Sequence, residues 1–264
     1  MKGKLYGIGV GPGDSELMTV KAARIVGEAD IIITPKTEKK DGSVALDIAS
    51  PYIQEHTEIV PVVFPMVLND ATQEEGWQEA KRIILSYLDE GKSVVFLTLG
   101  DPMFYSTYMY VYRLIENTGH EIETIPGVTA FCAIGSHLGY PIVEKEEVLA
   151  IVPATAPKEK IDAVLAVADD AVIMKVYKNF DEVQETLIKH NMADDAVMIS
   201  RVGLPDEQVF VGLDNMPKIL NSTICLQSLQ NVRTVNKHVV LRGNIYEHST
   251  YSTCCHCRHK LWCR

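Results

Sequence analysis

The sequence predicts an α/β fold of two domains, of which the first is larger and built on a mostly parallel sheet. Short apolar runs alternate with amphipathic stretches over most of the 264 residues, which is typical of repeated βαβ units. Three of the apolar runs end in glycine-containing turns, at residues 7–14, 100–107 and 126–130. Because ligands of parallel sheets bind at the carboxyl ends of the strands, these turns predict a binding site at that edge.

The first half of the chain supplies the elements of the larger domain. Strands are expected at residues 5–10, 31–34, 59–63, 94–99 and 122–125. The stretches between them carry apolar residues at helical spacing. Helices are therefore expected at 18–29, 77–88, 108–115 and about 128–138. Gly91 and Gly119 stand where two of these helices should end.

The second half repeats the pattern on a smaller scale. Gly139, Tyr140 and Pro141 break the preceding helix ahead of a charged run, so we place the first domain at 1–139 and the second at 140–218. Strands are expected at 149–152, 171–176, 196–200 and 208–212, and helices near 158–168 and 180–189. We expect this second α/β domain to pack closely on the first, with a cleft between them.

Composition and charge exclude several classes of protein. The formal net charge is −10, whereas a general nucleic-acid binder normally carries a surplus of lysine and arginine. No apolar run approaches the roughly 20 residues of a membrane span, and the first residues lack the profile of a signal peptide. The six cysteines do not resemble the framework of a small disulfide-rich secreted domain. We therefore expect a cytoplasmic protein that binds neither nucleic acid nor membrane.

The turn after the first strand combines glycines with a proline. Gly9, Gly11 and Gly13 allow close backbone approach and positive φ, while Pro12 restricts the loop. The turn lacks the full Gly-x-Gly-x-x-Gly spacing of a dinucleotide site, and Pro12 stands where a helix N-terminus would hold a pyrophosphate. We expect either a ligand loop that does not bind nucleotide phosphate or simply a tight strand-to-helix turn.

The turn at Gly100, Asp101 and Pro102 places a carboxylate and bare backbone at the end of the fourth strand. The hydroxylated residues that follow it favour a polar ligand with hydroxyl groups or a cationic centre. Asp101 could instead cap its own turn or the next helix, and Thr129 could be only a first-turn residue of its helix. From the residues alone, both interpretations remain open.

Three blocks of sequence together resemble the tetrapyrrole methyltransferase family. They are Gly-Val-Gly-Pro-Gly-Asp-Ser-Glu-Leu-Met-Thr from Gly9, Gly-Asp-Pro-Met-Phe-Tyr-Ser-Thr from Gly100, and Ile-Pro-Gly-Val-Thr-Ala from Ile125. Residues 174–179 and 200–203 are similar to the branch that methylates C-20 of precorrin-2 or of its cobalt complex. The resemblance covers residues 3 to about 218. It implies two α/β domains with S-adenosylmethionine in the cleft between them, a precorrin substrate and a homodimer.

The resemblance also implies which residues form the site. The methyl donor would be bound by Leu99, Gly100, Asp101, Phe104, Thr129, Ala130, Tyr177 and Val202. Pro12 would face the substrate, whose carboxylates need local basic partners because the protein itself is acidic. The basic candidates are Arg113, Lys175, Lys178 and Arg201. Arg113 and Arg201 are the two that we expect to bind substrate, although each of the four could be an ordinary solvated surface charge.

The implied reaction asks for little covalent help from the protein. The meso carbon of a reduced tetrapyrrole is already nucleophilic, so orientation and the exclusion of water would supply much of the catalysis. A base or solvent must take the proton left at that carbon, and the candidates are Tyr105, His137, Tyr177 and Glu144. The sequence singles out none of them. Two alternatives stay open, namely methylation at another tetrapyrrole position and a non-catalytic module that binds the donor or senses a metal.

Residues 219–264 depart from the family pattern. Family members usually finish with a short apolar strand soon after the segment matched by 213–218, whereas this tail loses that alternation. It ends in a cluster formed by Cys254, Cys255, His256, Cys257, His259 and Cys263. Because adjacent cysteines rarely reach one tetrahedral metal, we expect no protein-bound metal. We expect instead a flexible or out-of-frame tail that leaves the second domain without its last strand.

Overall fold

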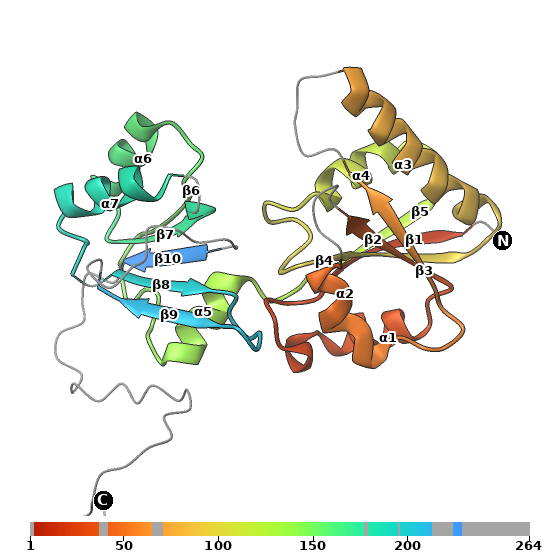
Figure 1. Cartoon of the computed structure of the whole chain (residues 1–264), viewed down its shortest axis with the longest axis horizontal. Helices are drawn as coiled ribbons and strands as arrows, with labels where there is room; N and C mark the ends of the chain where they lie inside the picture. Colours follow the sequence, from red (N-terminus) through yellow and green to blue (C-terminus); the bar gives the residue numbers. More distant parts are fainter. Residues whose placement is uncertain are drawn as a thin grey trace, which may run out of the picture. The chain divides into compact units, whose positions relative to one another are not determined.

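The structure is a computed structural model that describes residues 3–36, 42–64, 71–176, 179–194, 196–212 and 224–228. Its strands form two five-stranded sheets, each accompanied by helices (Figure 1). The predicted α/β fold is therefore confirmed. Within the described ranges, none of the helices has both the length and the apolar character that a membrane span requires. The Cys/His cluster at the end of the chain lies outside the described residues.

The first sheet is parallel throughout. Its strands are β1 (Lys4–Gly9), β2 (Ile31–Lys36), β3 (Glu58–Val63), β4 (Ser93–Thr98) and β5 (Glu121–Ile125). They lie in the order β3-β2-β4-β1-β5. β1 is therefore flanked by β4 and β5. Each of these three strands is followed by one of the glycine turns, so the turns meet at one edge of the sheet.

Helices cover both faces of the first sheet. They are α1 (Val20–Gly27), α2 (Val44–Ala49), α3 (Ala71–Asp89) and α4 (Tyr108–Ile115), of which α2 was not predicted. α1 and α2 lie on one face, and α3 and α4 lie on the other (Figure 1). Neighbouring strand residues point to opposite faces, so Leu97 packs in the α1 cluster and Phe96 packs in the α3 cluster. This two-sided burial explains why the strands are continuous apolar runs.

The second sheet is mixed. Its strands are β6 (Leu149–Pro153), β7 (Asp170–Met174), β8 (Ala196–Ser200), β9 (Gln208–Val211) and β10 (Ile224–Ser228), in the order β6-β7-β10-β8-β9. β10 is antiparallel to both of its neighbours, β7 and β8. The expectation that this domain lacks a last strand is therefore wrong. The strand lies within the stretch expected to be a tail, and it pairs at the centre of the sheet, where it links β7 to β8.

Helices lie on both faces of the second sheet as well. α6 (Lys158–Leu165) and α7 (Phe180–Lys189) bury one apolar cluster with it. α5 (Ala130–Leu138) packs on this sheet too, because Ile134 shares a cluster with Val172 and Val197. This packing differs from the boundary drawn from the sequence, which kept the helix in the first domain up to residue 139. The chain therefore passes from one sheet to the other immediately after β5, at the third glycine turn.

Candidate functional site

Four glycines bring the turns after β1, β4 and β5 into direct contact. The amide of Gly100 donates to the carbonyl of Gly11 at 2.8 Å, and the amide of Gly11 donates back to Gly100 at 3.4 Å. A Cβ placed on Gly9 would lie 2.6 Å from both the Gly100 oxygen and the Gly127 nitrogen. A Cβ on Gly127 would overlap the same Gly100 oxygen. The predicted convergence of the turns is confirmed, and it requires residues without side chains.

Asp101 ties two of these turns together. Its Oδ2 accepts a hydrogen bond from the amide of Gly127 at 3.1 Å, and its Oδ1 accepts one from the amide of Met103 at 2.8 Å. The second bond closes a local turn of the kind that the sequence offered as the structural interpretation of Asp101. The carboxylate is only partly buried, and its oxygens retain further acceptor capacity. Asp101 therefore braces the edge of the sheet while remaining accessible to a ligand.

Hydrogen bonds and packing fix the base of the loop between β4 and α4. The hydroxyl groups of Thr98 and Ser106 lie 2.6 Å apart, and Ser106 also accepts from the amide of Tyr108 at 3.1 Å. Tyr108 is fully buried, and burial raises the pKa of its phenol. A Cβ on Gly7 would overlap the Tyr108 ring, so this glycine makes room for it. The base of the loop is thus fixed by packing and by hydrogen bonds.

The outer side of the same loop presents apolar side chains. Leu99 is 39% exposed, Met103 48% and Tyr105 44%. Phe104 packs against Tyr105 and against Phe131 of α5, with ring centroids 4.8 and 5.5 Å apart respectively. Together these side chains give the loop an exposed apolar surface. Apolar surface that gathers in one place is typical of a ligand-binding site.

The N-terminus of α5 reaches the same edge without a side-chain cap. Thr129 is its N-cap residue, and its hydroxyl makes no capping hydrogen bond. At α1, by contrast, the N-cap residue Thr19 accepts from the amide of Ala22 at 3.1 Å. The amide groups at the start of α5 are therefore available to a ligand, and the helix dipole favours a negatively charged group there.

A loop from the second sheet lies against the first glycine turn. A Cβ on Gly13 would overlap the carbonyl oxygen of Val202 and would lie 2.7 Å from the carbonyl carbon of Gly203. Leu204 packs against the buried cluster beneath α1. Sequence reasoning placed Val202 near the donor but missed this glycine-to-glycine contact. The sequence signal for this contact was Gly203, in a turn just after the strand predicted at 196–200.

Glu207 holds this loop in shape. Its Oε2 accepts from the amide of Gly203 at 2.7 Å, and its Oε1 lies 2.9 Å from Nε2 of His137 on α5. His137 was one of the candidate bases, and here it is paired with a carboxylate at the surface. Sequence reasoning did not single out Glu207, since an acidic residue in an exposed turn carries no distinctive pattern.

Of the predicted substrate residues, Pro12 and Arg201 lie in turns at this edge, whereas Arg113 does not. Pro12 is buried in the first glycine turn. Arg201 pairs with Asp206, and the hydrogen bond from the guanidinium lowers the pKa of that carboxyl group. Arg113 is exposed in the last turn of α4, the end away from the Gly100 loop. Tyr177 and Lys178 lie outside the described residues.

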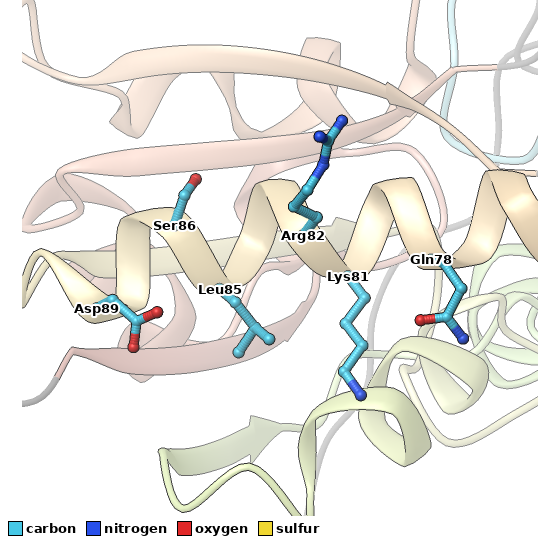
Figure 2. Close-up of a pocket in the computed structure, with 6 residues that line it drawn as sticks. All are labelled: Gln78, Lys81, Arg82, Leu85, Ser86 and Asp89. Atoms are coloured by element: carbon cyan, nitrogen blue, oxygen red, sulfur yellow. The ribbon is translucent and has the colours of Figure 1, made fainter.

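A shallow hollow elsewhere on the surface is not part of this site. It is lined by Gln78, Lys81, Arg82, Leu85, Ser86 and Asp89. Figure 2 shows that all six belong to α3, so the hollow is the side of one helix. In the part of the chain that the structure describes, no three histidine, cysteine or acidic residues are grouped to hold a metal ion.

Comparisons with known proteins agree on one family. The sequence profile described as Tetrapyrrole (Corrin/Porphyrin) Methylases matches residues 4–214. Over 228 residues the chain is 37% identical to a cobalt-precorrin-2 C(20)-methyltransferase of Salmonella typhimurium, covering 85% of this chain and 96% of that protein. Over 211 residues it is 31% identical to a precorrin-2 C(20)-methyltransferase of a Sinorhizobium species, covering 75% and 84%.

A solved structure shares the fold. It is the uroporphyrin-III C-methyl transferase from Thermus thermophilus complexed with S-adenyl homocysteine. The TM-score is 0.63 at 19% sequence identity, with 86% of this chain and 92% of that chain covered. The likeness extends over both sheets of the present protein.

Proposed function

Because the chain belongs to the tetrapyrrole methylase family, we propose that it transfers a methyl group from S-adenosylmethionine to C-20 of precorrin-2 or cobalt-precorrin-2 in cobalamin biosynthesis. The observation that carries this proposal is the similarity to the Salmonella C(20)-methyltransferase along nearly the whole length of that relative. The family match alone would leave the acceptor carbon open.

We propose that the donor binds at the edge where the three turns converge. A Cβ on Gly100 would meet nothing closer than the carbonyl oxygen of Val128 at 4.0 Å, so a ligand can approach the backbone closely there. The proposed donor site comprises Leu99, Gly100, Asp101, Phe104, Thr129, Ala130, Val202 and Tyr177. The open N-terminus of α5 suits the carboxylate of the donor, and the free acceptor capacity of Asp101 suits its hydroxyl or ammonium groups. The residues present therefore fit the donor.

The proposed role of the protein is positioning. When bound, S-adenosylmethionine would supply an activated methyl group: the S–CH3 bond would break as the meso carbon bonds the methyl group, S-adenosylhomocysteine would leave, and a base or solvent would take the proton lost from that carbon. The anchored loop at 100–107 and the uncapped helix α5 fix one reactant relative to the other, which lowers the entropic part of the barrier. The exposed apolar residues Leu99, Met103 and Tyr105 would cover the macrocycle and exclude water.

We further propose that Pro12, Arg113 and Arg201 contribute to the substrate side, that the protein needs no metal of its own, and that it acts as a cytoplasmic homodimer. Arg201 is close in sequence to the loop that meets Gly13, although its charge is paired with Asp206. Light scattering of the purified protein tests whether it is a dimer. A metal analysis of the active protein tests whether it needs a bound metal.

The decisive experiment is incubation with isotopically labelled S-adenosylmethionine and either precorrin-2 or cobalt-precorrin-2 under anaerobic conditions. We expect one labelled methyl group on the tetrapyrrole, at C-20 by carbon NMR, with formation of S-adenosylhomocysteine. A product methylated at another carbon would replace the proposed position. A protein that binds the donor and methylates neither acceptor would refute the proposal.

A further inference from the structure

We infer that Lys175 binds a peripheral carboxylate of the substrate, and that the ring of Tyr105 holds its ammonium group in place until the substrate arrives. This inference rests on the proposed function and adds a residue to it. It also names the ligand chemistry: a flat apolar ring system with a rim of acetate and propionate groups.

Lys175 and Tyr105 lie close together although they follow strands of different sheets. Lys175 directly follows β7, and Tyr105 belongs to the loop between β4 and α4. The Nζ atom of Lys175 lies 5.2 Å from the centroid of the Tyr105 ring. This distance is within the range of a cation–π contact, which attracts the ammonium group and leaves its charge unneutralised. The contact places a cation beside the exposed apolar face of the loop.

Both residues have an unusual backbone. The φ angle is +60° at Lys175 and +50° at Tyr105. Residues other than glycine rarely adopt this left-handed region, and such conformations gather at binding and catalytic sites. Here the two conformations aim the side chains at each other from different parts of the chain.

Lys175 differs from two other cations of the second domain in keeping its charge free. Arg201 is paired with Asp206, and Lys189 is paired with Asp162. In the described part of the chain, no carboxylate forms an ion pair with Lys175. A protein of net charge −10 cannot attract an anionic ligand over long distances. An unpaired ammonium group at the site can bind a carboxylate of such a ligand locally. Among the two, the geometry favours Lys175 over Arg201 as the partner of a substrate carboxylate.

The surroundings of Lys175 match an amphipathic ligand. The loop exposes apolar surface at Leu99, Met103 and Tyr105. The ammonium group of Lys175 lies beside this surface, next to the Tyr105 ring. A macrocycle lying on the apolar side chains would bring its rim of carboxylates to the ammonium group. The charge-assisted hydrogen bond would then replace the weaker cation–π contact.

The test compares Lys175→Ala with Lys145→Ala, a matched control. Lys145 also has positive φ, +53°, and lies in the exposed turn after α5, so its replacement removes the same charge from the same backbone conformation. The dissociation constant of precorrin-2 is measured by absorbance titration in the presence of S-adenosylhomocysteine, so no turnover is needed. We expect about tenfold weaker tetrapyrrole binding for Lys175→Ala, equivalent to about 1.4 kcal/mol, and no change for Lys145→Ala.

Two further variants separate charge from packing. Lys175→Arg retains a cation and should recover most of the affinity, whereas Lys175→Met retains the length of the side chain and should behave like Lys175→Ala. Binding of S-adenosylhomocysteine, measured by calorimetry, should stay within about twofold in all variants. A Lys175→Met protein that binds precorrin-2 like the wild type would overturn the inference, as would an equal loss of donor binding. A wild type that binds precorrin-2 without methylating it would refute the proposed function and leave this test valid.

Discussion

The ends of β1 and β5 differ from the exposed flank of the same two strands in what holds them together. At the carboxyl ends, backbone touches backbone through Gly9, Gly100 and Gly127, with no space for a side chain. Along the flank, Lys4 pairs with Glu121 and Glu123, whose side chains are partly or largely in water. Close-packed backbone cannot yield to an added atom, whereas solvated ion pairs rearrange at little cost. The turns should therefore be sensitive to substitution and the flank tolerant.

The largest effect is expected for Gly127→Ala. The new Cβ would overlap the carbonyl oxygen of Gly100, so the turns must separate, at a cost of about 3 kcal/mol or more in the free energy of unfolding. Urea unfolding monitored by circular dichroism measures it. Gly27→Ala is the control, because its Cβ would meet only the Tyr52 oxygen at 3.4 Å. If both variants were equally stable, the close contact of the three turns would be wrong.

A smaller loss is expected for Asp101→Ala. The substitution leaves the amides of Gly127 and Met103 without their acceptor, which should cost about 1–3 kcal/mol. Calorimetry should also show weaker binding of S-adenosylhomocysteine, because the two turns are no longer tied. Asp101→Asn keeps one acceptor oxygen and should fall between the variant and the wild type. An Asp101→Ala protein with normal stability and donor affinity would remove this residue from the site.

The sequence predicted the edge of the first sheet because its determinants are local. Each apolar run adjoins its own glycine turn, and a parallel sheet must bring those turns to one edge, so the sequence alone predicts that Gly9, Gly100 and Gly127 lie near one another, as they do. The identity of the proposed donor residues came from the family resemblance and not from this geometry.

The rest of the site and fold depends on pairing between distant segments. β10 is only five residues long and pairs antiparallel between β7 and β8, which no local pattern reveals. The left-handed backbone of Lys175 and Tyr105 is equally hidden, because neither residue type favours it. The pairing of Arg201 with Asp206 depends on how one turn closes. Sequence reasoning therefore identified the basic residues near the site but not which of them keeps a free charge.

The two N-cap threonines should respond in opposite ways to replacement by alanine. Thr19→Ala removes the hydrogen bond to the amide of Ala22 and should cost about 1 kcal/mol of stability without changing donor binding. Thr129→Ala removes no capping bond, so it should leave stability within about 0.5 kcal/mol and weaken donor binding several-fold. Thermal unfolding and calorimetry on the same preparations measure both. Equal stability losses in the two variants would mean that Thr129 is an ordinary cap.

The smallest effect is expected on the flank, for Glu123→Gln. The ammonium groups of Lys21 and Lys4 lower the pKa of Glu123 to about 2 from its ordinary 4.5. A depressed carboxyl pKa stabilises the fold above about pH 4.5, and that stabilisation is lost as the pH falls toward 2. Since the pairs are solvated and screened by salt, Glu123→Gln should cost less than about 1 kcal/mol at pH 7. Urea unfolding from pH 7 to pH 2 measures the stability difference between this variant and the wild type. That difference should shrink as the pH falls and as salt is added. A cost as large as that of Gly127→Ala would mean that the flank, like the turns, is held by contacts that cannot rearrange.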